Sequence, residues 1–232
     1  RAKIRHCLRL ICITCLCCSC TRTETDEVRT YEEFVTSLSD PIRMSRLDLP
    51  QAEIITSYDR TGGNSDFNNY VGREGDTRAI LADFKGPGYV TRFWTTGGES
   101  AEQKLQFFFD GEKNPRIDAT VNELRSGLVP FTPPLSRYEQ SCWWTYVPLT
   151  FRKSLKILAE TEGFSHEGWP RLFYQVNFCR LPPDEAVESF PKSFTPLHLA
   201  ATVGVACASF LGTDLLSAGL AVGIAVLVMQ WT

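Results

Sequence analysis

The chain has 232 residues, a formal net charge of −3 and 12% aromatic residues. This length allows one large β domain, or a medium-sized domain with appended segments, and the aromatic content is ample for a hydrophobic core. No basic cluster occurs beyond the first residues, so nucleic acid is not an expected partner.

The amino end, residues 1–25, has the pattern of an export signal. Basic residues lead into an apolar run at residues 10–18, which is too short to cross a bilayer as a helix. Small and polar residues follow, as at a secretory cleavage site. A cysteine just after such a run is typical of a bacterial lipoprotein, and Cys20 is the expected acylation site, although Cys17 stands where these signals usually carry leucine. We therefore expect an extracytoplasmic, membrane-associated protein, with secretion as the second choice.

Six of the nine cysteines lie within the first twenty residues, and the others are Cys142, Cys179 and Cys207. The six could instead ligate zinc, but no His or Cys group at the usual spacing accompanies them, so neither a metal nor another cofactor is expected. A disulfide framework is not indicated, and a single Cys142–Cys179 bridge requires that the fold bring the two residues together.

Residues 26–42 are a predicted helical lead-in to the main domain. In residues 27–39 (EVRTYEEFVTSLS) the apolar side chains have helical spacing. Asp40 and Pro41 are expected to end this helix.

The stretch Thr56–Phe67, TSYDRTGGNSDF, differs most from ordinary core or loop sequence. Gly62 and Gly63 allow positive φ at no steric cost. Two carboxylates, a guanidinium and an amide crowd into eight residues, and such loops on a rigid scaffold often carry binding groups. The alternative is a connection in which the Asp and Asn side chains bond their own backbone.

From residue 78 the pattern changes to β-strands. Runs rich in β-branched and aromatic residues alternate with Gly and Pro turns at intervals of about ten residues, which is typical of an all-β sandwich or barrel. The predicted strands are residues 79–84, 89–96, 104–109, 116–121, 143–151, 154–160 and 172–180. Pro148 marks an edge or a bulge in the strand at residues 143–151.

Six motifs occur in order: SYDRTGGNSDF, KGPGYVTRFW, FFFDGEKNPRI, VPFTPPL, YVPLTFRKSLKI and FYQVNF. Together, over residues 43–190, they resemble the amino-terminal half of glycoside hydrolase family 172. This resemblance implies an antiparallel β-sandwich of jelly-roll type, assembled into trimers or hexamers. It also implies retaining hydrolysis or transfer at α-D-fructofuranosides or α-D-arabinofuranosides.

The catalytic glutamates that the resemblance implies belong to a second half, and neither maps onto this chain. Retaining hydrolysis needs two carboxyl groups about 5–5.5 Å apart. No motif ties Glu160, Glu162 or Glu167 to that role, and solvated loop charge is the favoured interpretation. We therefore expect a truncated member of the family.

Residues 197–231 form a predicted apolar helical tail, in which Asp214 is the only acidic or basic residue apart from a histidine. Leu215–Trp231 carries no charge, and Gly219 and Gly223 have the spacing of closely packed membrane helices. We expect a membrane-associated helix or hairpin. The alternatives are a buried helix of a soluble protein, or a sequence altered by truncation or a frame change in the gene.

Two functions fit these patterns: an exported carbohydrate-active protein, or a non-catalytic sugar-binding or assembly module. In either, carboxylates and amides bond sugar hydroxyls, while an indole packs against the ring. The expected substrate-binding residues are Asp59, Arg60, Asn64, Asp66 and Trp94.

Overall fold

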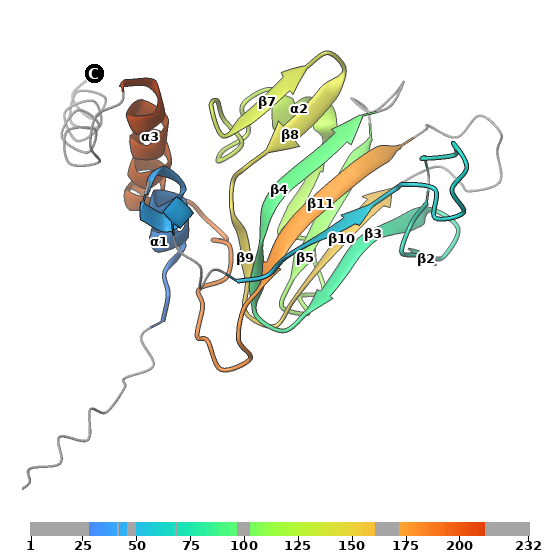
Figure 1. The fold of residues 1–232 in the computed structure, drawn as a ribbon, viewed down its shortest axis with the longest axis horizontal. Coiled ribbons are helices and arrows are strands. Elements are labelled where there is room, and N and C mark those ends of the chain that lie inside the picture. Colours follow the sequence, from blue (N-terminus) through green and yellow to red (C-terminus); the bar gives the residue numbers. More distant parts are fainter. Residues whose placement is uncertain are drawn as a thin grey trace, which may run out of the picture.

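The computed structural model describes residues 28–211, apart from residues 41, 46–49, 68, 97–102 and 161–171. Two antiparallel sheets stack face to face with the aromatic core between them (Figure 1). The predicted all-β antiparallel sandwich is confirmed. The predicted leader and Leu215–Trp231 lie outside the described residues.

The first sheet has six strands and the second has five. The six-stranded sheet has the order β1 (Ala52–Thr56), β11 (Phe173–Arg180), β4 (Gly88–Thr96), β8 (Cys142–Thr145) and β7 (Ser136–Glu139), and β9 (Leu149–Phe151) also pairs with β4. The five-stranded sheet has the order β2 (Gly72–Glu74), β3 (Arg78–Lys85), β10 (Ser154–Glu160), β5 (Lys104–Phe109) and β6 (Ile117–Thr120).

The core follows from side-chain alternation along these strands. In β5, Leu105, Phe107 and Phe109 point inward and are fully buried, because successive residues of a strand face opposite sides of the sheet. Phe107 meets Phe93 of the opposite sheet with ring centroids 5.8 Å apart. Burial of many such rings is the main stabilisation of the sandwich.

Helices flank the sandwich. Helix α1 (Tyr31–Thr36) continues as a 3-10 turn at Ser37–Ser39, and a second 3-10 turn follows at Ile42–Ser45. The other helices are α2 (Val121–Arg125) and α3 (Pro196–Leu211). The Thr30 hydroxyl accepts from the Glu33 backbone, and Glu33 returns the contact to the Thr30 N–H. This capping box sets the start of α1 later than the predicted residue 27.

Helix α1 covers part of the outer face of the six-stranded sheet. Phe34 contacts Tyr89 of β4 at a centroid distance of 4.8 Å. Burial raises the pKa of Tyr89 to about 12. Helix α1 therefore covers one end of that outer face. The candidate site described below lies toward the other end.

The predicted single strand at residues 143–151 is wrong, because the structure has β8 and β9 separated by Tyr146–Pro148. The Val147 N–H donates to the Thr145 hydroxyl at 3.0 Å instead of to a neighbouring strand. Pro148 has no N–H to offer. Three short strands (β1, β2 and β7) and helix α2 were not predicted.

The two thiols in the sandwich cannot form a disulfide. Cys142 pairs with Thr96 at one end of β4, whereas Cys179 pairs with Tyr89 near the other end. Seven residues of extended strand separate these positions by about 23 Å, far beyond disulfide reach. Both cysteines are free.

Helix α3 packs against α1 rather than standing apart. His198 is buried, and its Nε2 lies 3.0 Å from Glu32 Oε1. Its Nδ1 accepts from the Thr195 N–H at 3.1 Å. Val205 joins the main core. None of the described helices has the length and hydropathy needed to cross a membrane.

Candidate functional site

The predicted binding stretch lies in the connection between the two sheets at one end of the sandwich. Residues 57–71 leave β1, the edge strand of the six-stranded sheet, and lead to β2, the edge strand of the other (Figure 1). We call residues 57–69 the crossing loop. It lies at the end of the sandwich opposite the Gly86 and Gly111 turns.

Asp59 organises the crossing loop from within. Its Oδ1 accepts from the Thr61 hydroxyl at 2.6 Å and the Thr61 N–H at 2.9 Å, and its Oδ2 accepts from the Ser65 N–H at 3.3 Å. These hydrogen bonds lower the pKa of Asp59. The bond from the Thr61 hydroxyl has the largest effect, and the two backbone bonds add to it. This carboxylate therefore closes a turn. That is the structural role given above as the alternative to ligand binding, in which Asp side chains bond their own backbone.

The loop is anchored to the sheet by polar contacts of Asn69, Ser57 and Tyr174. The amide of Asn69 donates to Ser57 O at 2.8 Å and to Ser65 O at 2.7 Å. The Ser57 hydroxyl accepts from the Tyr174 N–H, and the Tyr174 hydroxyl donates to Asn69 O at 3.0 Å. Burial raises the pKa of Tyr174 to about 12, so this phenol remains a donor at neutral pH.

The remaining predicted loop residues differ in how many of their hydrogen-bonding groups are free to contact a ligand. Asp66 Oδ1 accepts from the Asp59 N–H at 2.7 Å, so one of its oxygens is used within the loop. Arg60 is exposed, donates to Thr56 O at 3.2 Å and stacks over the Tyr58 ring at 4.9 Å. Asn64 is also exposed and makes no side-chain hydrogen bond within the described part of the chain. Arg60 and Asn64 are thus the residues of this set with the most donor capacity left for a ligand.

Trp94, the fifth predicted residue, lies on the outer face of the six-stranded sheet. Its neighbour Phe93 is in the core, so Trp94 points the other way. It pairs with Trp144 on one side and with Gln175 on the other. Because Gln175 in turn pairs with Thr56, Trp94 lies two strands, or about 10 Å, from the start of the crossing loop.

Trp94 and Trp144 form a pair of partly exposed indoles on this face. Side chains directly opposite each other on antiparallel strands have Cβ atoms about 4.5–5.5 Å apart. Tyr146 extends the row, with its ring 5.5 Å from that of Trp144. This arrangement forms a partly exposed aromatic surface on the outer face of the six-stranded sheet.

Polar groups stand beside the indoles. Arg92 Nη1 donates to Gln175 Oε1 at 2.9 Å and lies 3.5 Å from Asn177 Oδ1. We call Trp94, Trp144, Arg92, Gln175 and Asn177 the tryptophan face. It adjoins the crossing loop, because Phe67 contacts Phe173, which lies next to Gln175 on that side, at 6.1 Å.

Four members of the tryptophan face were not predicted. A local signal existed, because Trp143 and Trp144 are consecutive in a strand and must face opposite sides. The same alternation in FYQVNF turns Gln175 and Asn177 away from the buried Tyr174 and Val176. Only the strand order, however, places these residues beside Trp94.

Of the three carboxylates considered for catalysis, only Glu160 belongs to the described residues, and it does not lie on the tryptophan face. Glu160 lies on the outer face of the five-stranded sheet, where its Oε2 is 3.2 Å from Lys104 Nζ. It is therefore a strand residue in an ion pair rather than a solvated loop charge. Glu162 and Glu167 lie outside the described residues. Across the described ranges, no three His, Cys, Asp or Glu side chains are placed to hold a metal ion.

Gly63 is expected to be required for the crossing loop. A Cβ on this residue would stand 2.5 Å from Asp59 Oδ2. Gly63→Ala should therefore break the Asp59 turn and raise amide hydrogen exchange in residues 57–67, while the free energy of unfolding changes by less than about 1 kcal/mol because the loop is exposed. Asn64→Ala is the matched control, and equal exchange in both variants would contradict the prediction.

The fold is a two-sheet antiparallel β-sandwich with paired indoles on the outer face of its six-stranded sheet. The family model described as the GH172 first beta-sandwich domain matches residues 50–197. The chain therefore belongs to glycoside hydrolase family 172, as the six motifs indicate. No curated protein matches the chain.

Proposed function

We propose that the chain binds furanoside-containing carbohydrate on the tryptophan face, beside the crossing loop. The observation that carries this proposal is the direct pairing of Trp94 with Trp144 on an open sheet face flanked by Arg92, Gln175 and Asn177. Indole faces pack against the C–H surface of a sugar ring, and amide and guanidinium groups bond its hydroxyls. Arg60 and Asn64 complete the site from the loop.

The sugar class proposed is α-D-arabinofuranoside or α-D-fructofuranoside, and membership of the family supports it. Binding is expected to exceed turnover when this chain is assayed alone. No described carboxylate pair stands at the tryptophan face, and a retaining hydrolase needs two. The second candidate function is therefore a non-catalytic sugar-binding or assembly module. A homo-oligomer, trimeric or hexameric, is proposed as its assembly, and a full-length relative would have to supply the missing carboxylates in trans.

Trp94→Ala is expected to weaken binding of an arabinofuranosyl or fructofuranosyl oligosaccharide by about tenfold, because one stacking surface is lost. Calorimetric titration measures the affinity, and aryl α-arabinofuranoside and α-fructofuranoside assays measure turnover in parallel. Leu197→Ala, which truncates an exposed apolar side chain outside this face, is the control. Unchanged affinity in Trp94→Ala would refute the site, and rapid turnover by the isolated chain would refute the binding-only version.

We also propose that the leader exports the chain and that Cys20 carries the lipid, with the apolar tail as an alternative membrane attachment. The basic and apolar pattern of residues 1–25 supports export. Cys20→Ser is expected to move the protein from the membrane fraction to the soluble extracytoplasmic fraction. Recovery of the unprocessed chain in the cytoplasm would contradict the proposal.

A further inference from the structure

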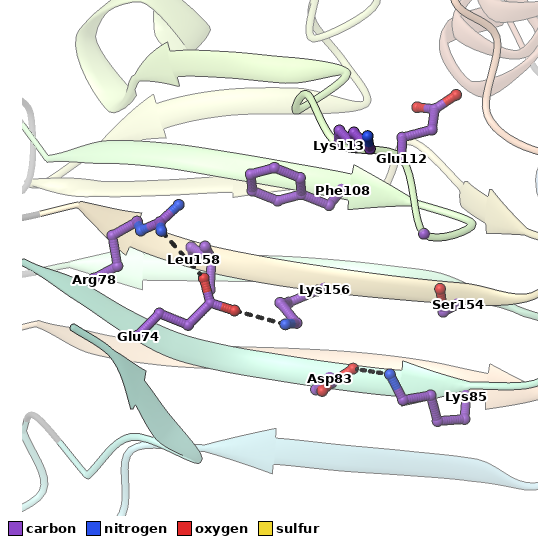
Figure 2. A pocket seen from close by; sticks show the side chains of 11 residues that line it. Glu74, Arg78, Asp83, Lys85, Phe108, Glu112, Lys113, Ser154, Lys156 and Leu158 are labelled. Atoms are coloured by element: carbon purple, nitrogen blue, oxygen red, sulfur yellow. Dashed lines mark hydrogen bonds and ion pairs between the residues drawn. The ribbon is translucent and has the colours of Figure 1, made fainter.

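The outer face of the five-stranded sheet carries a groove that the proposed sugar site does not use. It encloses about 340 Å³ and runs across β2, β3, β10 and β5. Figure 2 looks into it, with Phe108, Leu158 and Lys156 along its length. The tryptophan face belongs to the other sheet, so the two surfaces are on opposite sides of the sandwich.

Strand register places three kinds of group side by side in the groove. Asp83 of β3 pairs with Lys156 of β10, and Lys156 pairs with Phe108 of β5. Ser154 lies one step along the same face of β10, opposite Lys85. Phe108 is thus directly opposite Lys156, and the Ser154 hydroxyl lies diagonally across from it on the same face.

The acidic groups of the groove already have partners. Glu74 bonds Lys156 at 2.6 Å and lies 3.6 Å from Arg78, and Asp83 bonds Lys85 at 2.8 Å (Figure 2). These contacts occupy the carboxylates.

The third acid is also neutralised. Glu112 bonds Arg116 at 2.8 Å and Lys192 at 2.9 Å. Within the described ranges, the ammonium of Lys113 has neither a hydrogen bond nor an ion pair. An ammonium carries three donors, so Lys156 and Lys85 keep donors after their single ion pairs. The groove therefore has a surplus of cationic donors, which favours an anionic ligand.

The rim that carries Lys113 is held in place. Asp110 Oδ1 accepts from the N–H groups of Arg152 and Lys153 at 2.9 and 2.6 Å, and from that of Ser154 at 3.3 Å. Asp110 and Gly111 both have positive φ, at 54° and 78°. This bond set joins the turn of the β5–β6 hairpin to the connection between β9 and β10, so that Lys113 and Ser154 border the groove on a fixed frame rather than on a free loop.

We propose that this groove binds an acidic saccharide, with the sugar ring on Phe108 and its carboxylate between Lys113 and Lys156. Stacking selects a sugar over a simple anion. The charged hydrogen bonds select the carboxylate over a neutral sugar. This site is independent of the proposed furanoside site on the other sheet.

The test is calorimetric titration of the full chain with trigalacturonate, its fully methyl-esterified form and triglutamate. The acid sugar should bind, while the neutral ester and the peptide should bind at least about tenfold more weakly. Lys113→Gln and Phe108→Ala should each weaken trigalacturonate binding about five- to tenfold. Lys153→Gln removes an exposed charge from the neighbouring turn, and it should change the affinity for trigalacturonate by less than about twofold.

Other outcomes overturn the proposal. Equal affinity for the ester would mean that charge plays no part, and equal affinity for triglutamate with no effect of Phe108→Ala would mean that only charge matters. The absence of binding by any probe, or self-association of the chain that Phe108→Ala abolishes, would also overturn it. Trp94→Ala should leave trigalacturonate binding unchanged, so failure of the furanoside site is distinguishable from failure of this one.

Discussion

Trp143→Ala is expected to lower the free energy of unfolding by about 3–5 kcal/mol, the usual cost of truncating a buried aromatic residue. Trp143 is fully buried and meets Phe93 and Phe131 with ring centroids 5.6 and 5.8 Å apart. Its indole N–H has no hydrogen-bond partner in the described structure. The loss therefore comes from the cavity and the lost packing, not from a broken hydrogen bond.

The adjacent residue supplies the control for this prediction. Trp144→Ala removes an indole of the same size from the open face, so it should cost less than about 1 kcal/mol of stability. It should instead weaken furanoside binding, as Trp94→Ala does. Urea unfolding and sugar titration of both variants measure the two effects. Equal destabilisation by the two substitutions would contradict the assignment of inner and outer faces.

Arg116→Met is expected to lower the free energy of unfolding by about 2–4 kcal/mol, because it leaves buried polar groups without a partner. The Arg116 side chain is only 9% exposed. It donates to both oxygens of Glu112 and to the Phe190 carbonyl, and its guanidinium lies 4.8 Å from the Phe109 ring centre. Methionine keeps much of the volume but supplies no donor. Chemical denaturation measures the change.

Lys192→Met is the matched control, since Lys192 also bonds Glu112 but is 76% exposed. A surface ion pair of this kind contributes about 0–1 kcal/mol. A loss as large as that in Arg116→Met would contradict the prediction.

The same ion pair makes stability depend on pH. Arg116, followed by Lys192, lowers the pKa of Glu112 below its ordinary value of 4.5. A carboxyl group with a lowered pKa in the folded state stabilises that state above the unfolded pKa, and the stabilisation is lost as pH falls through the folded value. Wild-type stability should therefore fall more steeply below about pH 4.5 than that of Arg116→Met. Parallel curves for the two proteins would rule out this contribution.

The two outer faces of the sandwich differ in chemistry, and we propose that they bind different ligands. The six-stranded sheet presents indoles and amides, whereas the five-stranded sheet presents ion pairs around a single phenyl ring. A neutral furanoside suits the first surface and an acidic sugar suits the second. The chain is thus proposed to hold two sugars of different charge on opposite sides of one domain.

Residue patterns alone determined the class of fold and the family. Period-two alternation is local, so β5 and β11 could be located, and their inner and outer residues separated, from a few neighbouring residues. The same locality explains the errors. Tyr146–Pro148 interrupts an apparently continuous strand because the Thr145 hydroxyl accepts from the Val147 N–H. Pro148 indicated an edge or a bulge at this place, but no residue pattern predicts that hydrogen bond.

Tertiary structure decided which side chains meet. Trp94 and Trp144 belong to strands that are distant in the chain, and only pairing of β4 with β8 places them together. Pairing likewise sets Cys142 and Cys179 at opposite ends of β4. The carboxylate of Asp59 was visible in the sequence as a polar group in a glycine-rich loop, but its bonds to Thr61 and Ser65 depend on the folded turn. Composition and alternation depend on neighbours along the chain, whereas strand order and loop closure depend on contacts between distant segments, and those contacts exist only in the folded state.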